Sequence, residues 1–173
     1  HNTDRCSLTT TRMERCMEDQ SFDEAVYVYK LDNTSGFLSE DMSRSGYEIL
    51  KALSLPLKDK VALKPNVTVP AACDSGIVTH PDFVAGMVDY FLEQGIPGDK
   101  IMVAEGGGSD KMDEHYGRSG YIAMAKSRGA KLVNLNWDER VPVRLPQAVM
   151  LKEIGIARTV KDENTLFINV PKY

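Results

Sequence analysis

The sequence predicts an α/β fold built on an open, mostly parallel sheet with helices on both faces. Three observations point to it: short β-branched and apolar runs recur along the chain, helical patterns alternate with them, and the central runs are apolar throughout. Continuous apolar strands are typical of a sheet that is buried on both faces. Alternating strands and helices favour parallel neighbours joined by crossover helices.

Strands are expected wherever an apolar, β-branched run is bounded by turn residues. Five such runs span residues 25–31, 60–67, 100–105, 131–136 and 165–170. The region 140–163 is less regular, and Pro142 and Pro146 predict a loop or an excursion at the sheet edge before the last strand.

Helices are expected in the intervals between these strands. The clearest spans 82–94, because apolar residues recur there at helical spacing, Pro81 suits the first turn and Gly95 can end it. Two more are expected over 45–53 and 119–128. The resulting order of elements is that of a Rossmann-like, three-layer architecture.

The length of 173 residues fits one domain with a substantial core, and we assign it to residues 21–173 after an N-terminal extension at 1–20. The last strand is followed almost at once by the final residue. We therefore expect the sequence to be truncated after its fifth strand and to be the N-terminal part of a longer protein.

Composition narrows the classes of partner. A net charge of −4 without a basic stripe disfavours nucleic acid, and no apolar run approaches the roughly 20 residues that span a bilayer. Cys6, Cys16 and Cys73 form neither a CxxC pair nor a metal-ligand spacing, which suits a reducing compartment. We expect a cytoplasmic protein; self-association into a homo-oligomer stays open.

Five motifs occur in one order along the chain: VALKPN (61–66), THPDFV (79–84), AEGGG (104–108), LVNLN (132–136) and FINVPK (167–172). Their order and spacing resemble the family called domain of unknown function 362. Some members carry iron–sulfur segments with clustered cysteines, which this sequence lacks. The family is also distantly similar, at the level of fold, to the N-terminal domain of nickel-pincer lactate racemases.

The strand ends carry the main candidates for a site, because ligands of open α/β sheets bind beyond the carboxyl ends of the strands. Lys64 and Lys172 can bind a carboxylate or phosphate, or serve as a base; alternatively, each is a solvated lysine at the top of a strand. Asn66 follows Lys64 and is a further ligand-binding candidate.

Glu105 is followed by Gly106, Gly107 and Gly108. Glycines let a backbone approach a ligand closely and expose amide donors, while Glu105 can act as a base or metal ligand. The alternative is a flexible turn before the next helix. The spacing matches neither GxGxxG nor a phosphate-binding P-loop, so it does not predict a nucleotide site.

Thr79 and His80 precede the clearest helix. Their amides can hold an anion at the helix N-terminus, and His80 can transfer a proton or bind metal. The simpler interpretation is that both residues only cap the helix.

Other polar residues are weaker candidates. The segment 109–117 contains His115 among carboxylates, which fits a metal site less well than a mobile surface or lid loop. Asn134, Asn136 and Asp138 follow the fourth strand and most simply satisfy loop backbone. Cys73 has no activating base beside it in sequence.

Three hypotheses about function follow. The favoured one is an enzyme domain for a small anionic molecule, with Lys64, Glu105 and His80 as catalytic residues in proton-transfer or redox-linked chemistry. The alternative is an accessory module that holds a metal or iron–sulfur centre together with a missing C-terminal part. The third is a structural or oligomerising fragment with no site of its own. The sequence identifies neither a cofactor nor a metal.

Overall fold

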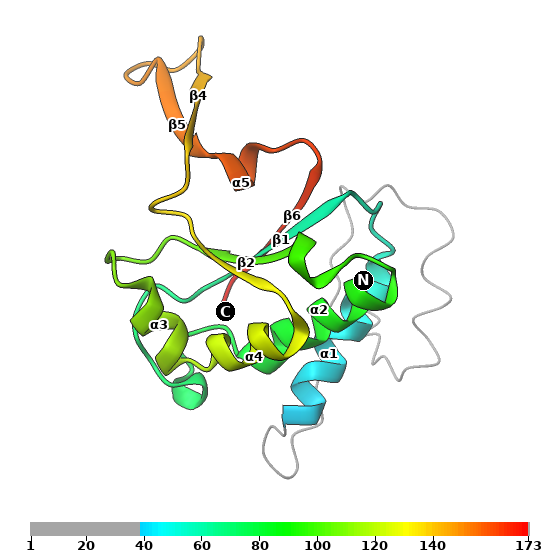
Figure 1. Ribbon diagram of the computed structural model, residues 1–173. Coiled ribbons are helices and arrows are strands. Elements are labelled where there is room, and N and C mark those ends of the chain that lie inside the picture. The colour runs from blue at the N-terminus through cyan, green and yellow to red at the C-terminus, as the bar shows by residue number, and fades with distance from the viewer. Residues whose placement is uncertain (1–38, 173) are drawn as a thin grey trace, which may run out of the picture.

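The computed structural model describes residues 39–172, so the expected strand at 25–31 and the extension at 1–20 lie outside the described part. Its centre is a four-stranded, wholly parallel sheet (Figure 1). The strands stand in the order β3, β2, β1, β6, with bounds Lys131–Asn134, Ile101–Glu105, Lys60–Pro65 and Thr165–Val170. The predicted α/β fold with a parallel sheet is confirmed.

Helices cover the two faces unequally (Figure 1). One face carries α1 (Ser39–Leu53), α2 (Pro81–Glu93), α3 (Met112–Arg118) and α4 (Tyr121–Arg128). The other carries the single turn α5 (Arg158–Lys161), and short 3₁₀ turns η2 (Cys73–Ser75) and η3 (Gly98–Lys100) lie in connections. The three helices expected from sequence are present, although α1 begins at Ser39 rather than at 45.

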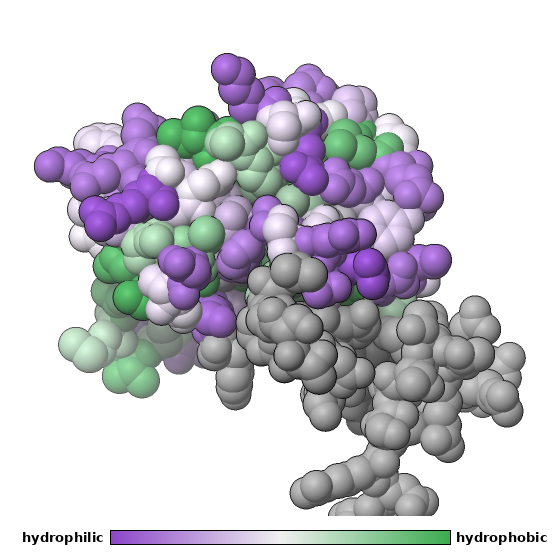
Figure 2. Space-filling view, turned by 90° about the horizontal axis from the view of Figure 1, so that it is seen from below, coloured by the Kyte–Doolittle hydropathy of each residue, from purple (hydrophilic) through white to green (hydrophobic). Residues whose placement is uncertain are grey.

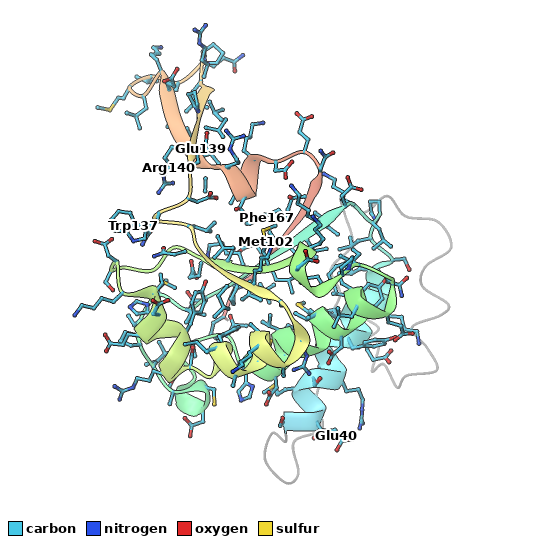
Figure 3. The ribbon with its side chains drawn as sticks, in the orientation of Figure 1. Glu40, Met102, Trp137, Glu139, Arg140 and Phe167 are labelled. Carbon is cyan, nitrogen blue, oxygen red and sulfur yellow. The ribbon has the colours of Figure 1, made fainter. Side chains whose placement is uncertain are left out.

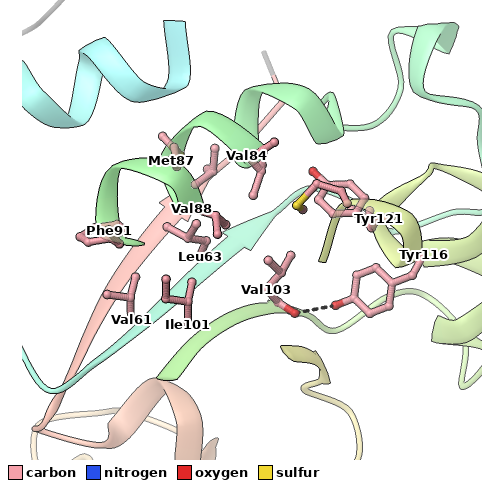
Figure 4. Close-up of a cluster of buried hydrophobic side chains, with 14 of the residues drawn as sticks. Val61, Leu63, Val84, Met87, Val88, Phe91, Ile101, Val103, Tyr116 and Tyr121 are labelled. Carbon is pink, nitrogen blue, oxygen red and sulfur yellow. Dashed lines mark hydrogen bonds between the residues drawn. The ribbon is translucent and has the colours of Figure 1, made fainter. Parts of the chain in front are cut away.

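The main core lies between the sheet and α2 (Figure 4). Alternate residues of β1 and β2 face this helix, since side chains of a strand alternate between the two faces of a sheet. Val61 and Val103 are fully buried, as is Phe91 of α2. Burying one such side chain contributes about 1.5–3 kcal/mol.

Two glycines allow α1 and α2 to touch backbone to backbone. A Cβ on Gly46 would lie 1.9 Å from the carbonyl oxygen of Phe83, and one on Gly86 would lie 1.8 Å from that of Ser43. Any larger residue would therefore push the helices apart. This contact fixes α2, and with it the loop that precedes α2 at the edge of the sheet.

The region 140–163 forms an arm. β4 (Arg140–Arg144) and β5 (Glu153–Ala157) make an antiparallel pair that projects from the body, and Figure 3 labels Glu139 and Arg140 at its foot. An ion pair between Glu139 and Arg158 ties the foot to α5. The predicted edge excursion is thus a separate two-stranded sheet.

The surfaces of the two layers differ. Viewed from the helical side, the molecule is largely hydrophilic with scattered apolar residues (Figure 2). On the opposite side of the sheet, Met102 and Phe167 lie on neighbouring parts of the face that α5 occupies and are only partly buried (Figure 3). Within residues 39–172, no helix has the length and apolar character needed to cross a membrane.

Candidate functional site

The carboxyl ends of the four strands meet at one edge of the sheet. β1 lies between β2 and β6, with Leu63 aligned with Val103 and Lys64 aligned with Asn169. The three strand ends that the sequence singles out are therefore neighbours. From β1 the chain leads to β2 on one side, whereas β6 lies on the other, so the strand order reverses between β1 and β6. In open α/β sheets this switch point is the usual place for a ligand.

Glu105 is the most deeply buried charged group at this edge, with 1% of its side chain exposed. Its Oε1 accepts a hydrogen bond from the Gly106 amide at 2.7 Å and forms an ion pair with Lys64 Nζ at 3.0 Å. Its Oε2 accepts one from the Val67 amide at 3.0 Å. Both oxygens are thus occupied by donors of the protein itself, and the carboxylate joins the ends of β1 and β2.

Lys64 is the exposed partner of this pair. Its side chain is 32% exposed, and its ammonium group pairs with the Glu105 carboxylate. Removing either partner of such a pair leaves a charge that is buried or poorly compensated, which is strongly unfavourable. The pair therefore fixes a cation at the centre of the sheet edge.

Thr79 and Asn66 tie the switch point together. Thr79 Oγ1 donates to the carbonyl of Val170 and accepts from the Asn66 amide, both at 2.9 Å. Asn66 Nδ2 donates to the carbonyl of Ile77. The Thr79 hydroxyl both donates and accepts a hydrogen bond, so these contacts hold the loop after β1 against the end of β6.

His80 caps α2, as the simpler interpretation of the sequence predicted, whereas the expectation that Thr79 also caps it is wrong, because its hydroxyl bonds Asn66 and Val170 instead. Its Nδ1 accepts from the Asp82 amide at 3.3 Å, and Pro81 occupies the first turn. The imidazole also lines an open hollow of about 570 Å³, together with Cys73 and Arg118. Neither Lys64 nor Glu105 lines this hollow, so His80 does not share it with the other two expected catalytic residues.

The glycine run packs against protein. A Cβ on Gly107 would lie 2.6 Å from Met112 Sδ and 2.9 Å from His115 Nδ1, whereas one on Gly108 would meet nothing nearer than 3.6 Å. The amide of Gly107 donates to Met112 Sδ, and that of Gly108 to the carbonyl of Thr68. With the Gly106 amide on Glu105, all three amides have protein acceptors, so the expected free amide donors are not there.

Segment 109–117 contains the helix α3, and the expectation of a loop there is wrong. His115 is 3% exposed, its Nδ1 lies 3.1 Å from the carbonyl of Val67, and its Nε2 lies 3.0 Å from Ser109 Oγ. The signal was present in the sequence, since Met112 and Tyr116 stand one helical turn apart and both are buried. Within residues 39–172, no three His, Cys, Asp or Glu side chains form a group that could hold a metal.

The polar residues after β3 satisfy loop backbone, as expected. Asn136 Nδ2 donates to the carbonyls of Gly107 and Ser109, and the Asn136 amide donates to Asn134 Oδ1. Asp138 accepts from the Thr159 amide. These bonds hold the glycine run from the β3 side.

Two buried tyrosines hydrogen-bond to backbone carbonyls near the same edge, and they were not identified as candidates from the sequence. Tyr116 OH donates to the carbonyl of Val133, and Tyr121 OH to that of Thr79. Burial raises the pKa of both phenols well above the usual value of 10.0, so both stay protonated donors. Lys172 is exposed at this edge, just beyond β6.

One chain of contacts runs through the site. Lys64 bonds Glu105, Glu105 bonds the Val67 amide, the Val67 carbonyl lies against His115, and His115 contacts Ser109. Its ends, Lys64 and Ser109, reach solvent, while the middle is buried. Such an arrangement can present a fixed cation at one end and a polarised hydroxyl at the other.

Comparison with known protein families finds one match, over residues 61–173, to a family described as a domain of unknown function (DUF362). Neither the curated proteins nor the solved structures gave a match. The matched range covers well over half of the chain and contains all five of the motifs that carry the resemblance. The chain therefore belongs to the DUF362 family.

Proposed function

We propose that this chain is a small-anion-binding domain of an enzyme, with its site at the carboxyl edge of the parallel sheet. The observation that carries the proposal is the position of Lys64, a lysine at the sheet edge that is paired with a buried carboxylate. Its side chain is one-third exposed, at the centre of the edge, and its ammonium group is held in place by the buried Glu105. A carboxylate or a phosphate is the ligand that such a fixed cation suits.

The neighbourhood of Lys64 supports a ligand on the β6 side. Lys64 and Asn169 are aligned on adjacent parallel strands, so their side chains leave the same face of the sheet. Asn169 is exposed, and its amide group can donate a second hydrogen bond to an anion. Lys172, further along the same strand end, adds positive charge.

Glu105 takes a positioning role in this proposal. Both of its oxygens already accept hydrogen bonds, so it is poorly placed to take a proton from a ligand. Its negative charge holds the lysine ammonium at the edge, and its bonds to two amides keep the strand ends in register. His80 lies in the separate hollow, and we assign it the capping of α2.

The test is a titration of the purified chain with inorganic phosphate, in which NMR chemical shifts of the amides report binding. We expect saturable shifts at Asn169 and near Lys64. Lys64→Met should weaken binding at least about tenfold, since a hydrogen bond to a charged group contributes roughly 1.5–3 kcal/mol. The matched control is Lys60→Met, at the opposite end of β1, where the lysine also pairs with a carboxylate, that of Asp162.

A second variant separates binding from folding. Lys64→Met alone leaves Glu105 without its cation, whereas Lys64→Met combined with Glu105→Gln removes both charges of the pair. If this folded double variant binds phosphate as tightly as the unchanged chain, the proposal is wrong.

A further inference from the structure

A serine, a histidine and a backbone carbonyl lie in series beside the glycine run. Ser109 follows the glycine run directly and is exposed. Its Oγ lies 3.0 Å from Nε2 of His115, and the other ring nitrogen of that histidine lies 3.1 Å from the carbonyl oxygen of Val67. Nucleophile, base and orienting group within hydrogen-bond reach form the general pattern of an activated hydroxyl.

The contacts assign the tautomer of His115. A carbonyl oxygen only accepts, so the hydrogen bond to Val67 requires the proton on Nδ1. Nε2 of the neutral ring is then an acceptor, and the Ser109 hydroxyl is its donor. This is the protonation state in which an imidazole can remove the proton of an attacking hydroxyl.

The base is held rigidly. His115 is buried, and its ring lies so close to Gly107 that a Cβ there would be 2.9 Å from Nδ1. The carbonyl that orients the ring belongs to Val67, which is itself fully buried and whose amide is fixed by Glu105. The ring therefore has one orientation, with Nε2 directed to the exposed serine.

The surroundings of Ser109 leave room for a reaction. The Lys111 amide donates to the serine oxygen at 3.3 Å, which leaves that oxygen a second lone pair for attack. Within residues 39–172 the amides of Ser109 and Asp110 donate to no acceptor. Backbone amides at and beside a nucleophile are the usual donors to the oxyanion of an acyl-transfer intermediate.

We propose that Ser109 is a nucleophile, that His115 is its general base, and that the pair hydrolyses small carboxylic esters. This inference goes beyond anion binding and does not require Lys64 to hold a ligand. It rests on the juxtaposition of an exposed hydroxyl, a buried oriented imidazole and free amides.

The proposed hydrolysis has two stages, acylation of Ser109 and hydrolysis of the acyl-serine. Ser109 Oγ attacks the ester carbonyl carbon while its proton passes to His115 Nε2, and the carbonyl electron pair moves to oxygen. The tetrahedral intermediate collapses, the C–O bond to the alcohol breaks, and the alkoxide takes the proton from Nε2. Water, deprotonated by His115 Nε2, then attacks the acyl-serine. The C–O bond to Ser109 Oγ breaks, Oγ takes the proton from Nε2, and the carboxylic acid is released. The sum is ester and water giving acid and alcohol.

The experiment uses the purified chain with two probes: a fluorophosphonate, which transfers its phosphonyl group to an activated serine and releases fluoride, and p-nitrophenyl acetate. We expect the fluorophosphonate adduct on Ser109 by peptide mass spectrometry, and a burst of p-nitrophenolate that approaches one per chain. Ser109→Ala should abolish both signals. His115→Gln should slow labelling on the order of 10²-fold or more.

Ser75 is the matched control, because it is an exposed loop serine whose hydroxyl donates only to a carbonyl, that of Ala72. Ser75→Ala should change neither signal. Because Ser109 is exposed, Ser109→Ala is expected to fold even if His115→Gln does not. If Ser109 is labelled no faster than Ser75, the pair serves only to fasten the loop to α3 and the proposal is overturned.

Discussion

Glu105 places a carboxylate where water hardly reaches it, at the junction of two parallel strands. It pairs with the Lys64 ammonium group and accepts hydrogen bonds from two backbone amides, so three groups depend on one side chain. Burying a charge is unfavourable unless it is paired and hydrogen-bonded, and here both conditions are met. The residue thus links stability of the edge to the position of its cation.

Glu105→Ala should lower the free energy of unfolding by about 3–5 kcal/mol, because it leaves Lys64 and two amides without their acceptor. Urea denaturation measures this change. Glu139→Ala is the control, since its pair with Arg158 is more than half exposed on both sides and should contribute little to stability. Equal losses in the two variants would contradict the role given to Glu105.

Gly107→Ala tests the close approach of the glycine run to α3. The added methyl group must displace Met112 Sδ or the His115 ring, which should lower the free energy of unfolding by about 1–3 kcal/mol. Gly108→Ala has room for its methyl group and should be nearly neutral. Thermal unfolding of the two variants compares them directly; an equally stable Gly107→Ala chain would show that the loop packs differently.

At the scale of elements, the contact between α1 and α2 is set by small residues. Gly46 and Gly86 each stand where a Cβ would overlap a carbonyl of the other helix. Because the nearest atoms belong to the backbone, no side chain can move aside for a larger residue. The helices themselves would have to move apart. Because α2 starts at the sheet edge, its placement also determines where the loop before it meets β6.

Gly86→Ala should lower the free energy of unfolding by about 3 kcal/mol or more, even though alanine favours helix by up to about 1 kcal/mol. Gly117→Ala is the control. It makes the same exchange in α3, where the nearest atom, Ile122 Cδ1, would be an ordinary 3.5 Å away. Chemical denaturation should show a lower free energy of unfolding for Gly86→Ala and no decrease for Gly117→Ala. A change of the same sign in both variants would refute the helix contact.

The start of β1 is joined to the turn after α5 by an ion pair. Lys60 Nζ lies 2.9 Å from Asp162 Oδ2, and this contact, with the Asn164 amide, lowers the pKa of Asp162 from 3.8 to about 2. A lowered pKa means that folding favours the ionised carboxyl. The stabilisation is therefore complete above pH 4 and is lost as the pH falls toward 2.

Asp162→Asn should accordingly be less stable than the unchanged chain at pH 7. The difference in unfolding free energy should shrink between pH 4 and pH 2, where the natural carboxyl takes up its proton. Denaturation at a series of pH values measures it. A difference that stays constant from pH 7 to pH 2 would show that the charge of Asp162 does not contribute.

At the scale of the whole molecule, periodicity and apolar runs predicted the sheet and three of its helices, because burial imposes those patterns. They missed α3, whose carboxylates and His115 resemble a solvated loop although Met112 and Tyr116 lie on its buried side. The arm was foreseen only as an excursion, because Pro142 lies within β4 and proline in an apolar run argues against a strand.

The positions of the candidate site residues in the fold were predictable, but their contacts were not. Parallel strands had to bring Lys64, Glu105 and Lys172 to one edge, and the structure has them there. The sequence could not show that Glu105 and the glycine amides are satisfied internally, because their partners come from other elements. The sequence also could not show the contact between Ser109 and His115, because that contact depends on the conformation of the turn between them.

A crystal structure of the chain soaked in phosphate tests the central claim, an anion site at Lys64, most directly. The account predicts phosphate oxygens within hydrogen-bond distance of Lys64 Nζ and the Asn169 side chain, with the contact between Lys64 and Glu105 retained. An ordered phosphate only in the hollow beside Arg118 and His80, with Lys64 touching Glu105 alone, would contradict it.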